Sequence, residues 1–318
     1  MATRLILRWL VTVALLGLVL SLLDTGALQA SLARLSVPFI VLMLAVSVVQ
    51  VALSAWRWWY TARRLGVSLS YPVAIREYYL AGFLNQVLPG GVMGDVNRAW
   101  RHARAPVGEP LSGNATRATR AIVHAVMLER LSGQLVLLPV AVLAMAALWL
   151  SGRFELQAAY AGTSLSAGAG MVALVLAGVG ASFMLRRKNG GRLRSYLRNL
   201  GADLRKAFYG WRNACLQCLT SLLVLGTYLA VFLLLAADMD VLGQGVSPWM
   251  LAGLCVLLLL AMAVPVTISG WGVREGAAAL LWPLAGLPAE QGVALSVGYG
   301  AMVFLASLPG ALVLVSGR

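Results

Sequence analysis

Two short polar segments interrupt an otherwise apolar chain, and each carries an arginine close to a carboxylate. The segments are residues 85–101, which contain Arg98, and residues 265–276, which contain Arg274. Charged side chains inside apolar sequence are costly in a membrane, so they usually face a partner or a polar cavity. An arginine in such a place could bind the phosphate of an anionic ligand. These two segments are therefore the first candidates for a functional site.

The two segments share the pattern P-x4-G-x3-R at a constant offset of 176 residues. The matching positions are Pro89, Gly94 and Arg98 in the first segment, and Pro265, Gly270 and Arg274 in the second. Proline ends a helix, and glycine allows the backbone to turn before a new helix begins. Broken backbone survives at membrane depth only inside protein or beside a water-filled cavity, and the start of the next helix attracts anions. The pattern predicts two broken helices that meet near mid-membrane, each with an arginine in the first turn of the restarted helix, although three matched positions can also arise by chance.

The charged residues of these segments also have purely structural interpretations. Asp95 could be the N-cap of a helix, and Arg98 could be an ordinary arginine of a cytoplasmic loop. Arg274 and Glu275 could form a local ion pair at a helix start. Both interpretations stay open at this stage, since capping and function can coincide.

A third polar feature is the pair Glu129 and Arg130 near the start of the long apolar stretch 121–150. Glu129 could pair with Arg98 or Arg274 inside the protein. Alternatively, the pair could lie at the membrane interface with its charged ends reaching toward water.

Signatures of soluble chemistry are missing from the sequence. The only histidines, His102 and His124, do not stand in metal-ligand spacing with cysteine or carboxylate residues. We find no phosphate-binding loop, no dinucleotide fingerprint and no Ser/His/Asp arrangement. We therefore expect no metal, no cofactor and no catalytic residues.

Composition requires that these segments sit among membrane helices. The chain has 318 residues, of which 60% are hydrophobic and 11% are charged, and its mean hydropathy is +0.84. Stretches of more than about 18 apolar residues can cross the hydrocarbon core. The candidate spans are residues 5–23, 38–60, 121–150, 166–185, 214–237, 248–268 and 289–315, with a shorter apolar piece at 274–286. We predict an all-α polytopic membrane protein with a single transmembrane domain over 1–318. It would contain about seven to eight transmembrane helices and one or two re-entrant helices, and it could be an internal repeat with halves of about 1–150 and 166–318.

The distribution of basic residues predicts the orientation. The net charge is +14, and positive residues concentrate in 57–120 and in 186–213. In a membrane protein such an excess indicates cytoplasmic loops and anionic lipid headgroups rather than nucleic acid. The N-terminus is then cytoplasmic, and segment 71–100 must enter and leave on the cytoplasmic side as a re-entrant hairpin or a helix pair. Segment 274–286 could be re-entrant or could cross, which leaves the side of the C-terminus open.

Two further features belong to the predicted membrane surface. The basic loop 186–213 could form an amphipathic helix that contacts anionic headgroups, or it could serve only to fix the topology. Aromatic residues at the end of the second span are expected to anchor it at the interface. These aromatic residues are Trp56, Trp58, Trp59 and Tyr60.

Three motifs resemble one known family. They are N-x-x-L-P-G-G-x-x-G-D at 85–95, E-R at 129–130 and P-V-T-I-S-G-W-G-V-R-E-G at 265–276. Together they are similar to the signatures of the lysylphosphatidylglycerol synthase transmembrane (flippase-like) family, over about residues 5–315. In the bifunctional synthases such a domain is joined to an aminoacyl-transferase domain, which these residues do not contain, so we expect no lysyl-lipid synthesis from this chain alone. The resemblance implies lipid translocation, and it implies site roles for Asn85, Pro89, Gly94, Asp95, Arg98, Glu129, Arg130, Gly270, Gly272, Arg274 and Glu275.

The leading hypothesis is a lipid translocase of the bacterial inner membrane that moves a phospholipid or a polyprenyl-linked lipid. Arg98 and Arg274 would hold the anionic headgroup, and the carboxylates of Asp95, Glu129 and Glu275 would hold the arginines or bind a coupling proton. One alternative is a membrane-embedded enzyme acting on a lipid-linked substrate. Another is an accessory or scaffold protein that binds lipid beside a partner enzyme.

Overall fold

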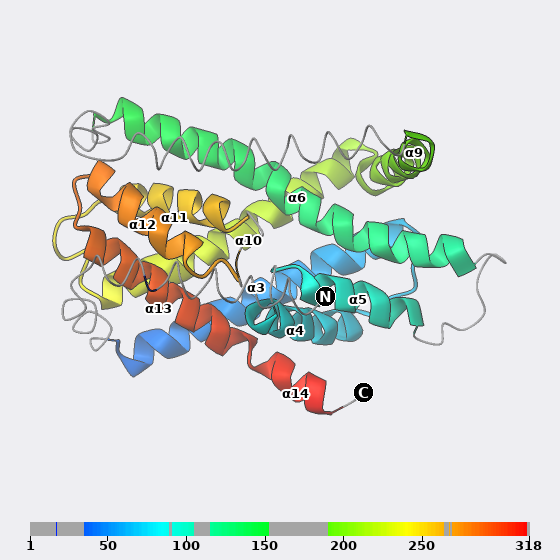
Figure 1. The fold of residues 1–318 in the computed structure, drawn as a ribbon, viewed down its shortest axis with the longest axis horizontal. Helices are drawn as coiled ribbons and strands as arrows, with labels where there is room; N and C mark the ends of the chain where they lie inside the picture. The colour runs from blue at the N-terminus through cyan, green and yellow to red at the C-terminus, as the bar shows by residue number, and fades with distance from the viewer. Residues whose placement is uncertain are drawn as a thin grey trace.

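The computed structural model describes residues 17, 35–88, 91–104, 115–152, 190–263, 267 and 269–316, and the regular elements of these residues are all α-helices (Figure 1). This result confirms the all-α prediction. The helices are α3 (Val37–Arg64), α4 (Tyr71–Val87), α5 (Met93–Arg104), α6 (Ala115–Leu150), α9 (Gly190–Phe208), α10 (Trp211–Asp238), α11 (Pro248–Met262), α12 (Val273–Leu284), α13 (Ala289–Ser307) and α14 (Pro309–Val315).

Four helical stretches in the described part of the chain are long and apolar enough to cross a membrane. They are Val37–Arg64, Thr119–Leu150, Trp211–Asp238 and Ala289–Val315. These stretches confirm the predicted spans at 38–60, 121–150, 214–237 and 289–315. The predicted spans 5–23 and 166–185 lie outside the described residues.

The long helices give the bundle two ends. At one end, which we call the α9 end, Arg64 at the end of α3 donates from Nη2 to the backbone oxygen of Lys206 in α9, over 3.1 Å. At the opposite end, the Ser36 hydroxyl just before α3 donates to Asp238, the last residue of α10, over 2.7 Å. The long axis of Figure 1 runs between these two ends.

Helices α4 and α5 form a pair that enters from the α9 end and returns to it. They contain 17 and 12 residues, so they are about 25 and 18 Å long and fall short of the roughly 30 Å needed to cross. The pair packs closely at Gly94, where an added Cβ would lie 2.0 Å from the carbonyl oxygen of Ala81. This close approach explains the glycine. The predicted hairpin or helix pair at 71–100 is present, while its cytoplasmic side stays a prediction.

Helices α11 and α12 form a second short pair, which enters from the opposite end. They contain 15 and 12 residues, or about 22 and 18 Å of helix. The predicted span 248–268 is therefore wrong, because its helix ends at Met262 and cannot cross alone. Helix α12 returns to the opposite end, so the segment predicted at 274–286 is a half-helix, and α13 with α14 runs back toward the α9 end.

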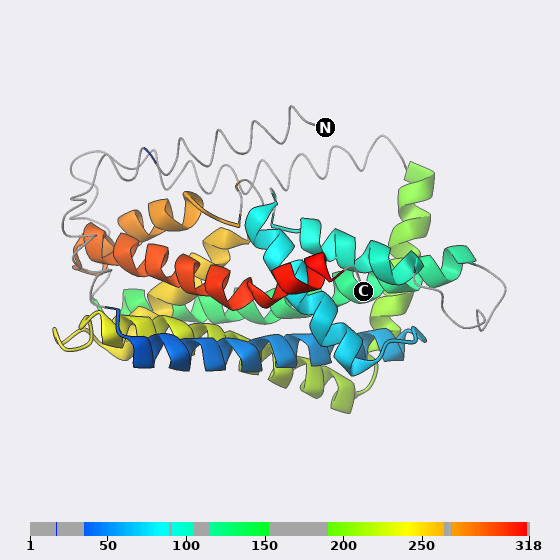
Figure 2. The ribbon, with the colours of Figure 1, turned by 90° about the horizontal axis from the view of Figure 1, so that it is seen from below.

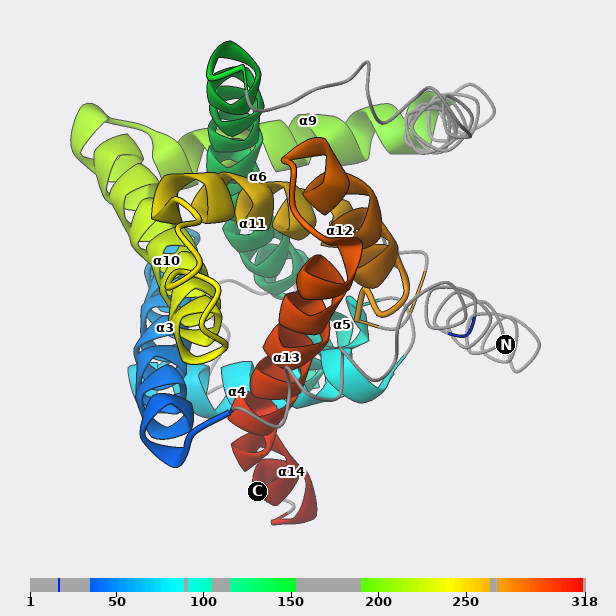
Figure 3. The ribbon, with the colours of Figure 1, turned by 90° about the vertical axis from the view of Figure 1, so that its left-hand side faces the viewer.

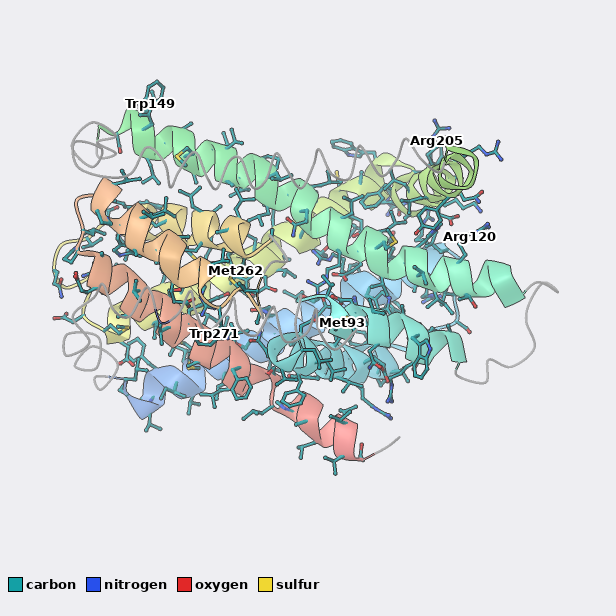
Figure 4. The ribbon with its side chains drawn as sticks, in the orientation of Figure 1. Met93, Arg120, Trp149, Arg205, Met262 and Trp271 are labelled. Atoms are coloured by element: carbon teal, nitrogen blue, oxygen red, sulfur yellow. The ribbon has the colours of Figure 1, made fainter. Side chains whose placement is uncertain are left out.

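The tips of the two short pairs meet inside the bundle. Just after the break in the second pair, the Ser269 hydroxyl donates to Oε1 of Gln86, near the end of α4, over 2.7 Å. Met93 at the start of α5, Met262 at the end of α11 and Trp271 before α12 all lie near the middle of the molecule (Figure 4). The two broken segments are thus neighbours in space although they are far apart in sequence.

Helix α9 crosses the bundle instead of running along it, as Figures 2 and 3 show. It is joined to α6 by a 2.7 Å contact between Nδ1 of His124 and a carboxylate oxygen of Asp203. The predicted amphipathic helix in the basic loop is therefore present as a helix, and it lies across one end of the bundle.

We expect the close approach between α14 and α4 to be sensitive to one methyl group. An added Cβ at Gly310 would lie 2.2 Å from the backbone oxygen of Tyr79, so Gly310→Ala forces a backbone shift. Overpacking of this kind costs about 1–3 kcal/mol. The protein in detergent should therefore melt at a lower temperature.

The matched control is Gly226→Ala in α10, where nothing lies within 4 Å of the added Cβ. Alanine is the better helix former by about 0.5–1 kcal/mol. This variant should melt at the wild-type temperature or above it. Equal melting temperatures for the two variants would contradict the packing described for α14.

Candidate functional site

Five charged side chains form a cluster between α3, α5 and α6, which we call the central ion cluster: Arg57, Asp95, Arg98, Glu129 and Arg130. Its centre is Glu129, which is fully buried and accepts hydrogen bonds from Nη2 of Arg57 over 2.5 Å and from Nη2 of Arg98 over 3.1 Å. The prediction that Glu129 pairs with Arg98 or Arg274 is therefore confirmed for Arg98.

Asp95 is the second carboxylate of the cluster. It accepts from Nη2 of Arg98 over 2.9 Å and from Nη2 of Arg130 over 2.5 Å. The amide of Asn85 donates to the same carboxylate over 3.3 Å, while its oxygen accepts from the backbone N–H of Gly94 over 2.8 Å. Asn85 therefore ties the end of α4 to the start of α5 and orients Asp95 toward the arginines.

The charges of the cluster do not cancel. Three guanidinium groups face two carboxylates, which leaves one positive charge in excess. Within the described part of the chain, Nε and Nη1 of Arg98 and Nε of Arg57 have no hydrogen-bond acceptor. Buried donors without acceptors are costly, so the cluster is chemically suited to accept a further anion.

Aromatic rings enclose Arg98. Its guanidinium lies 4.4 Å from the ring centre of Trp58 and 4.6 Å from that of Tyr78, both in cation–π range. The Tyr78 hydroxyl also donates to Glu129 over 3.1 Å. The interpretation of Trp58 as an interface anchor is wrong, because only 1% of this residue is exposed.

Helix α10 completes the enclosure. The Ser221 hydroxyl accepts from Nη1 of Arg57 over 2.9 Å, and the Gln217 amide donates to the Thr61 hydroxyl over 2.9 Å. Sequence reasoning missed Arg57 and Ser221. A signal for Arg57 existed, since it is the only charged residue in the stretch 35–62.

Two further contacts hold α5 in place in its part closer to the α9 end. Arg101 donates from Nε to Glu77 over 3.2 Å, and Nε2 of His102 lies 3.1 Å from the backbone oxygen of Ser68. Burial lowers the pKa of His102, against the opposing effects of Ser68 and Glu77. His102 is therefore neutral near pH 7 and serves as a packing and hydrogen-bonding residue.

A second polar centre lies at the start of α12. Nη2 of Arg274 donates to Glu275 over 2.7 Å, and Nε of Arg274 donates to the Ser296 hydroxyl of α13 over 2.8 Å. Glu275 also accepts from the backbone N–H of Gly272 over 2.6 Å, which satisfies an otherwise free N–H at this helix end. This centre holds one cation and one carboxylate, so it is a neutral pair.

Glycines shape the second centre. Gly270 and Gly272 have φ values of +79° and +84°, a conformation that side chains with a Cβ rarely adopt. At Gly300 of α13, an added Cβ would lie 2.1 Å from Nη2 of Arg274. The guanidinium therefore occupies space that a side chain would otherwise fill.

The helix positions of the shared pattern differ between the two segments. Arg274 is the second residue of α12, as predicted, but Arg98 is the sixth residue of α5, so the prediction of a first-turn arginine is wrong there. Gly94 lies inside α5, whereas Gly270 precedes α12. Pro89 and Pro265 lie outside the described residues. The sequence match alone therefore does not make the two segments structurally equivalent.

The structure also tests the purely structural interpretations of these charged residues. Arg98 is buried, so it is not a loop arginine, while Arg274 and Glu275 do form a local ion pair. Asp95 is the third residue of α5, and its carboxylate contacts side chains. Arg130 belongs to the cluster, but 48% of its side chain is exposed. Within the described residues, no group of His, Cys, Asp and Glu side chains could hold a metal.

The two centres lie at different depths. Glu129 precedes the end of α6 at Leu150 by 21 residues, or about 32 Å along the helix. Arg274 precedes the end of α12 at Leu284 by ten residues, or about 15 Å. Both helices end at the opposite end of the bundle. Measured along these helices, Glu129 is therefore about 32 Å and Arg274 about 15 Å from the opposite end.

Comparison with known proteins identifies the family of the chain. The family model described as the lysylphosphatidylglycerol synthase TM region matches residues 5–310. The chain belongs to this family. No significant match was found among the curated proteins or among the solved structures. Membership confirms the resemblance found in the sequence and identifies a multi-pass membrane protein involved in lipid-related processes.

The contacts of Glu129 predict a large stability loss for Glu129→Gln. The substitution keeps the shape of the side chain but removes the charge that Arg57 and Arg98 share. Breaking a buried ion pair costs about 3–5 kcal/mol, because the partner charge stays buried without compensation. Thermal or denaturant unfolding in detergent would measure this loss.

The control is Glu290→Gln in the first turn of α13, where loss of a helix-end charge should cost less than about 1 kcal/mol. The double variant Arg57→Met with Glu129→Gln should regain part of the stability, since it removes one uncompensated charge. Wild-type stability of Glu129→Gln would mean that Glu129 does not hold the two arginines together.

Proposed function

We propose that this protein is a lipid translocase of the bacterial inner membrane, which moves a phospholipid or a polyprenyl-linked lipid. In this proposal the central ion cluster receives the anionic headgroup, and the α9 end faces the cytoplasm. The observation that carries the proposal is the excess positive charge of the cluster, in which Arg57 and Arg98 are buried and Arg130 is half exposed, in a membrane protein of a lipid-associated family.

The donor atoms of Arg98 support the choice of the cluster as the headgroup site. A phosphate has several acceptor oxygens and forms strong charge-assisted hydrogen bonds with guanidinium groups. Arg98 has two donor atoms without a partner among the described residues. A bound phosphate would satisfy these donors and would neutralise the excess charge.

The position of Arg130 supports entry of a lipid headgroup into the cluster from the side of the bundle. It is half exposed, and it flanks exposed apolar residues: Leu131 on the same helix and Val96 next to its partner Asp95. A lipid could therefore place its headgroup at Arg130 while its acyl or prenyl chains stay in the surrounding bilayer. This arrangement suits a substrate that is polar at one end only.

Arg274 is proposed as a second station for the headgroup. It lies about 15 Å from the opposite end of the bundle, which is near the middle of a hydrocarbon core roughly 30 Å thick. The headgroup would reach Arg274 after the central ion cluster, so the two arginines would act in succession instead of holding one phosphate together.

The carboxylates offer a route for coupling to protons. When a phosphate takes over Arg98, Asp95 or Glu129 loses a cationic partner. A carboxylate with fewer cations beside it binds a proton more readily, although Asp95 would keep Arg130 and Glu129 would keep Arg57. Proton uptake with headgroup binding would couple lipid movement to a proton gradient, and Glu275 could act in the same way at the second station.

The proposal predicts that Arg98→Gln and Arg274→Gln both slow lipid movement. Purified protein would be reconstituted into vesicles that contain a fluorescent phosphatidylglycerol, and the exchange of label between leaflets would be followed by chemical quenching from outside. Loss of charge-assisted hydrogen bonds worth about 1.5–3 kcal/mol corresponds to roughly a tenfold to hundredfold slower rate. Arg212→Gln, an exposed arginine outside both centres, is the matched control and should move lipid at the wild-type rate.

Other outcomes of this experiment identify the alternatives. Chemical conversion of the labelled lipid would indicate a membrane-embedded enzyme. Lipid that co-purifies but never changes leaflet would indicate an accessory or scaffold protein that acts with a partner enzyme. Either result contradicts translocation, and mass spectrometry of the co-purified lipid would name the substrate class.

A further inference from the structure

Helix α9 meets α6 at a level that would coincide with lipid headgroups if Leu150 lies at the opposite surface of the bilayer. Its contact residue on α6, His124, precedes Leu150 at the opposite end by 26 residues, or about 39 Å along the helix. A bilayer is roughly 40–45 Å thick when its headgroups are included. Because α9 runs across the bundle at this level (Figures 2 and 3), its long axis follows the membrane surface.

One side of α9 is fixed to the bundle. The Asp203 carboxylate faces His124 over 2.7 Å, and the Tyr196 hydroxyl donates to the sulfur of Met127 over 3.1 Å. The backbone oxygen of Lys206 accepts from Arg64 over 3.1 Å. Asp203 is the only acidic residue of α9, and one of its oxygens faces His124 while the other lies 3.9 Å from Nζ of Lys206.

The remaining described residues of α9 leave positive charge on the outside. Arg198, Arg205 and Lys206 are exposed, with the exposed Ala202 between them. Beyond the helix, Tyr209 and Trp211 are 78% and 83% exposed. Aromatic side chains of this kind favour the headgroup region, where their rings contact lipid and their polar atoms contact water.

We propose that the outer face of α9, formed by Arg198, Ala202, Arg205 and Lys206, binds the anionic phospholipid headgroups of the membrane leaflet at the α9 end. The charge of this face is complementary to phosphatidylglycerol, and the exposed rings lie where a membrane surface would cover them. An acidic protein could also match the charge. The depth of α9 and the neighbouring aromatic residues favour the bilayer, since a protein partner would not require either feature.

This binding surface is independent of the translocated lipid. It involves neither the central ion cluster nor Arg274, and it needs only that the protein is in a bilayer. A basic residue near an anionic surface contributes about fivefold to binding, so the attachment of α9 depends on the anionic lipid content of one leaflet.

The test uses a fluorescent label on α9 in the full-length protein. The three cysteines, Cys215, Cys218 and Cys255, are replaced by alanine, and Ala202→Cys is labelled with an environment-sensitive dye. The protein is placed in vesicles of phosphatidylcholine alone or of an equimolar mixture with phosphatidylglycerol. We expect a blue-shifted emission and stronger quenching by a headgroup-region lipid quencher in the mixture, and we expect high salt to reverse both effects.

Two controls separate surface binding from other effects. The same label at Gln244→Cys, which is exposed at the opposite end, should not respond to α9 charge. Neutralising Arg198, Arg205 and Lys206 to glutamine should abolish the response at Ala202→Cys, while lipid movement by the variant reports separately on the proposed translocation.

A label at Ala202→Cys that stays water-exposed in both vesicle types would overturn the proposal and would favour a protein partner. A response that is equal with and without phosphatidylglycerol would also overturn it, since that result would mean apolar insertion without recognition of charge. Both outcomes are measured on labelled protein that keeps its basic residues. They therefore do not depend on whether the neutralised variant folds.

Discussion

The buried carboxylate of Glu129 connects four helices through one charged group. It lies on α6 and accepts from Arg57 of α3, Tyr78 of α4 and Arg98 of α5. In a medium without water these donors have few other acceptors, and a buried charge without a partner is far more costly than an exposed one. The positions of α3, α4 and α5 against α6 therefore depend on one ionised side chain that is itself fully enclosed.

The same constraint governs the two broken helix pairs. Breaking a helix frees backbone groups that lipid cannot satisfy, so each tip must find its partners within the protein. Asn85 accepts from the N–H of Gly94 at one tip, and Glu275 accepts from the N–H of Gly272 at the other. The Ser269 hydroxyl then links the second tip to Gln86 of the first. Polar side chains of the candidate site thus serve first to make the broken backbone possible.

The features that depend on composition averaged over many residues could be predicted from the sequence. Apolar length predicted the four spans at 38–60, 121–150, 214–237 and 289–315 but overestimated the helix at 248–268. The count of basic residues predicted that α4 and α5 return to the end they came from. The environment of a single residue could not be predicted where the same residue type occurs both at the membrane interface and in the interior. Arg57 was counted among the loop arginines and Trp58 among the interface anchors, although both face the interior. The shared pattern also overstated the likeness of the segments, because spacing along a chain does not specify where a helix restarts.

The partners of the carboxylates bear on how the proposed headgroup binding could proceed. A phosphate that draws Arg98 or Arg274 away must not leave a buried carboxylate without any donor. Asp95 would keep the Asn85 amide, and Glu275 would keep the Gly272 N–H and the Ser296 hydroxyl, which lies 3.0 Å from it. Both carboxylates therefore have a neutral donor in addition to their arginine. Exchange of the arginine between a carboxylate and a phosphate would then cost less than full separation of a buried ion pair, which is the property that a succession of headgroup stations requires.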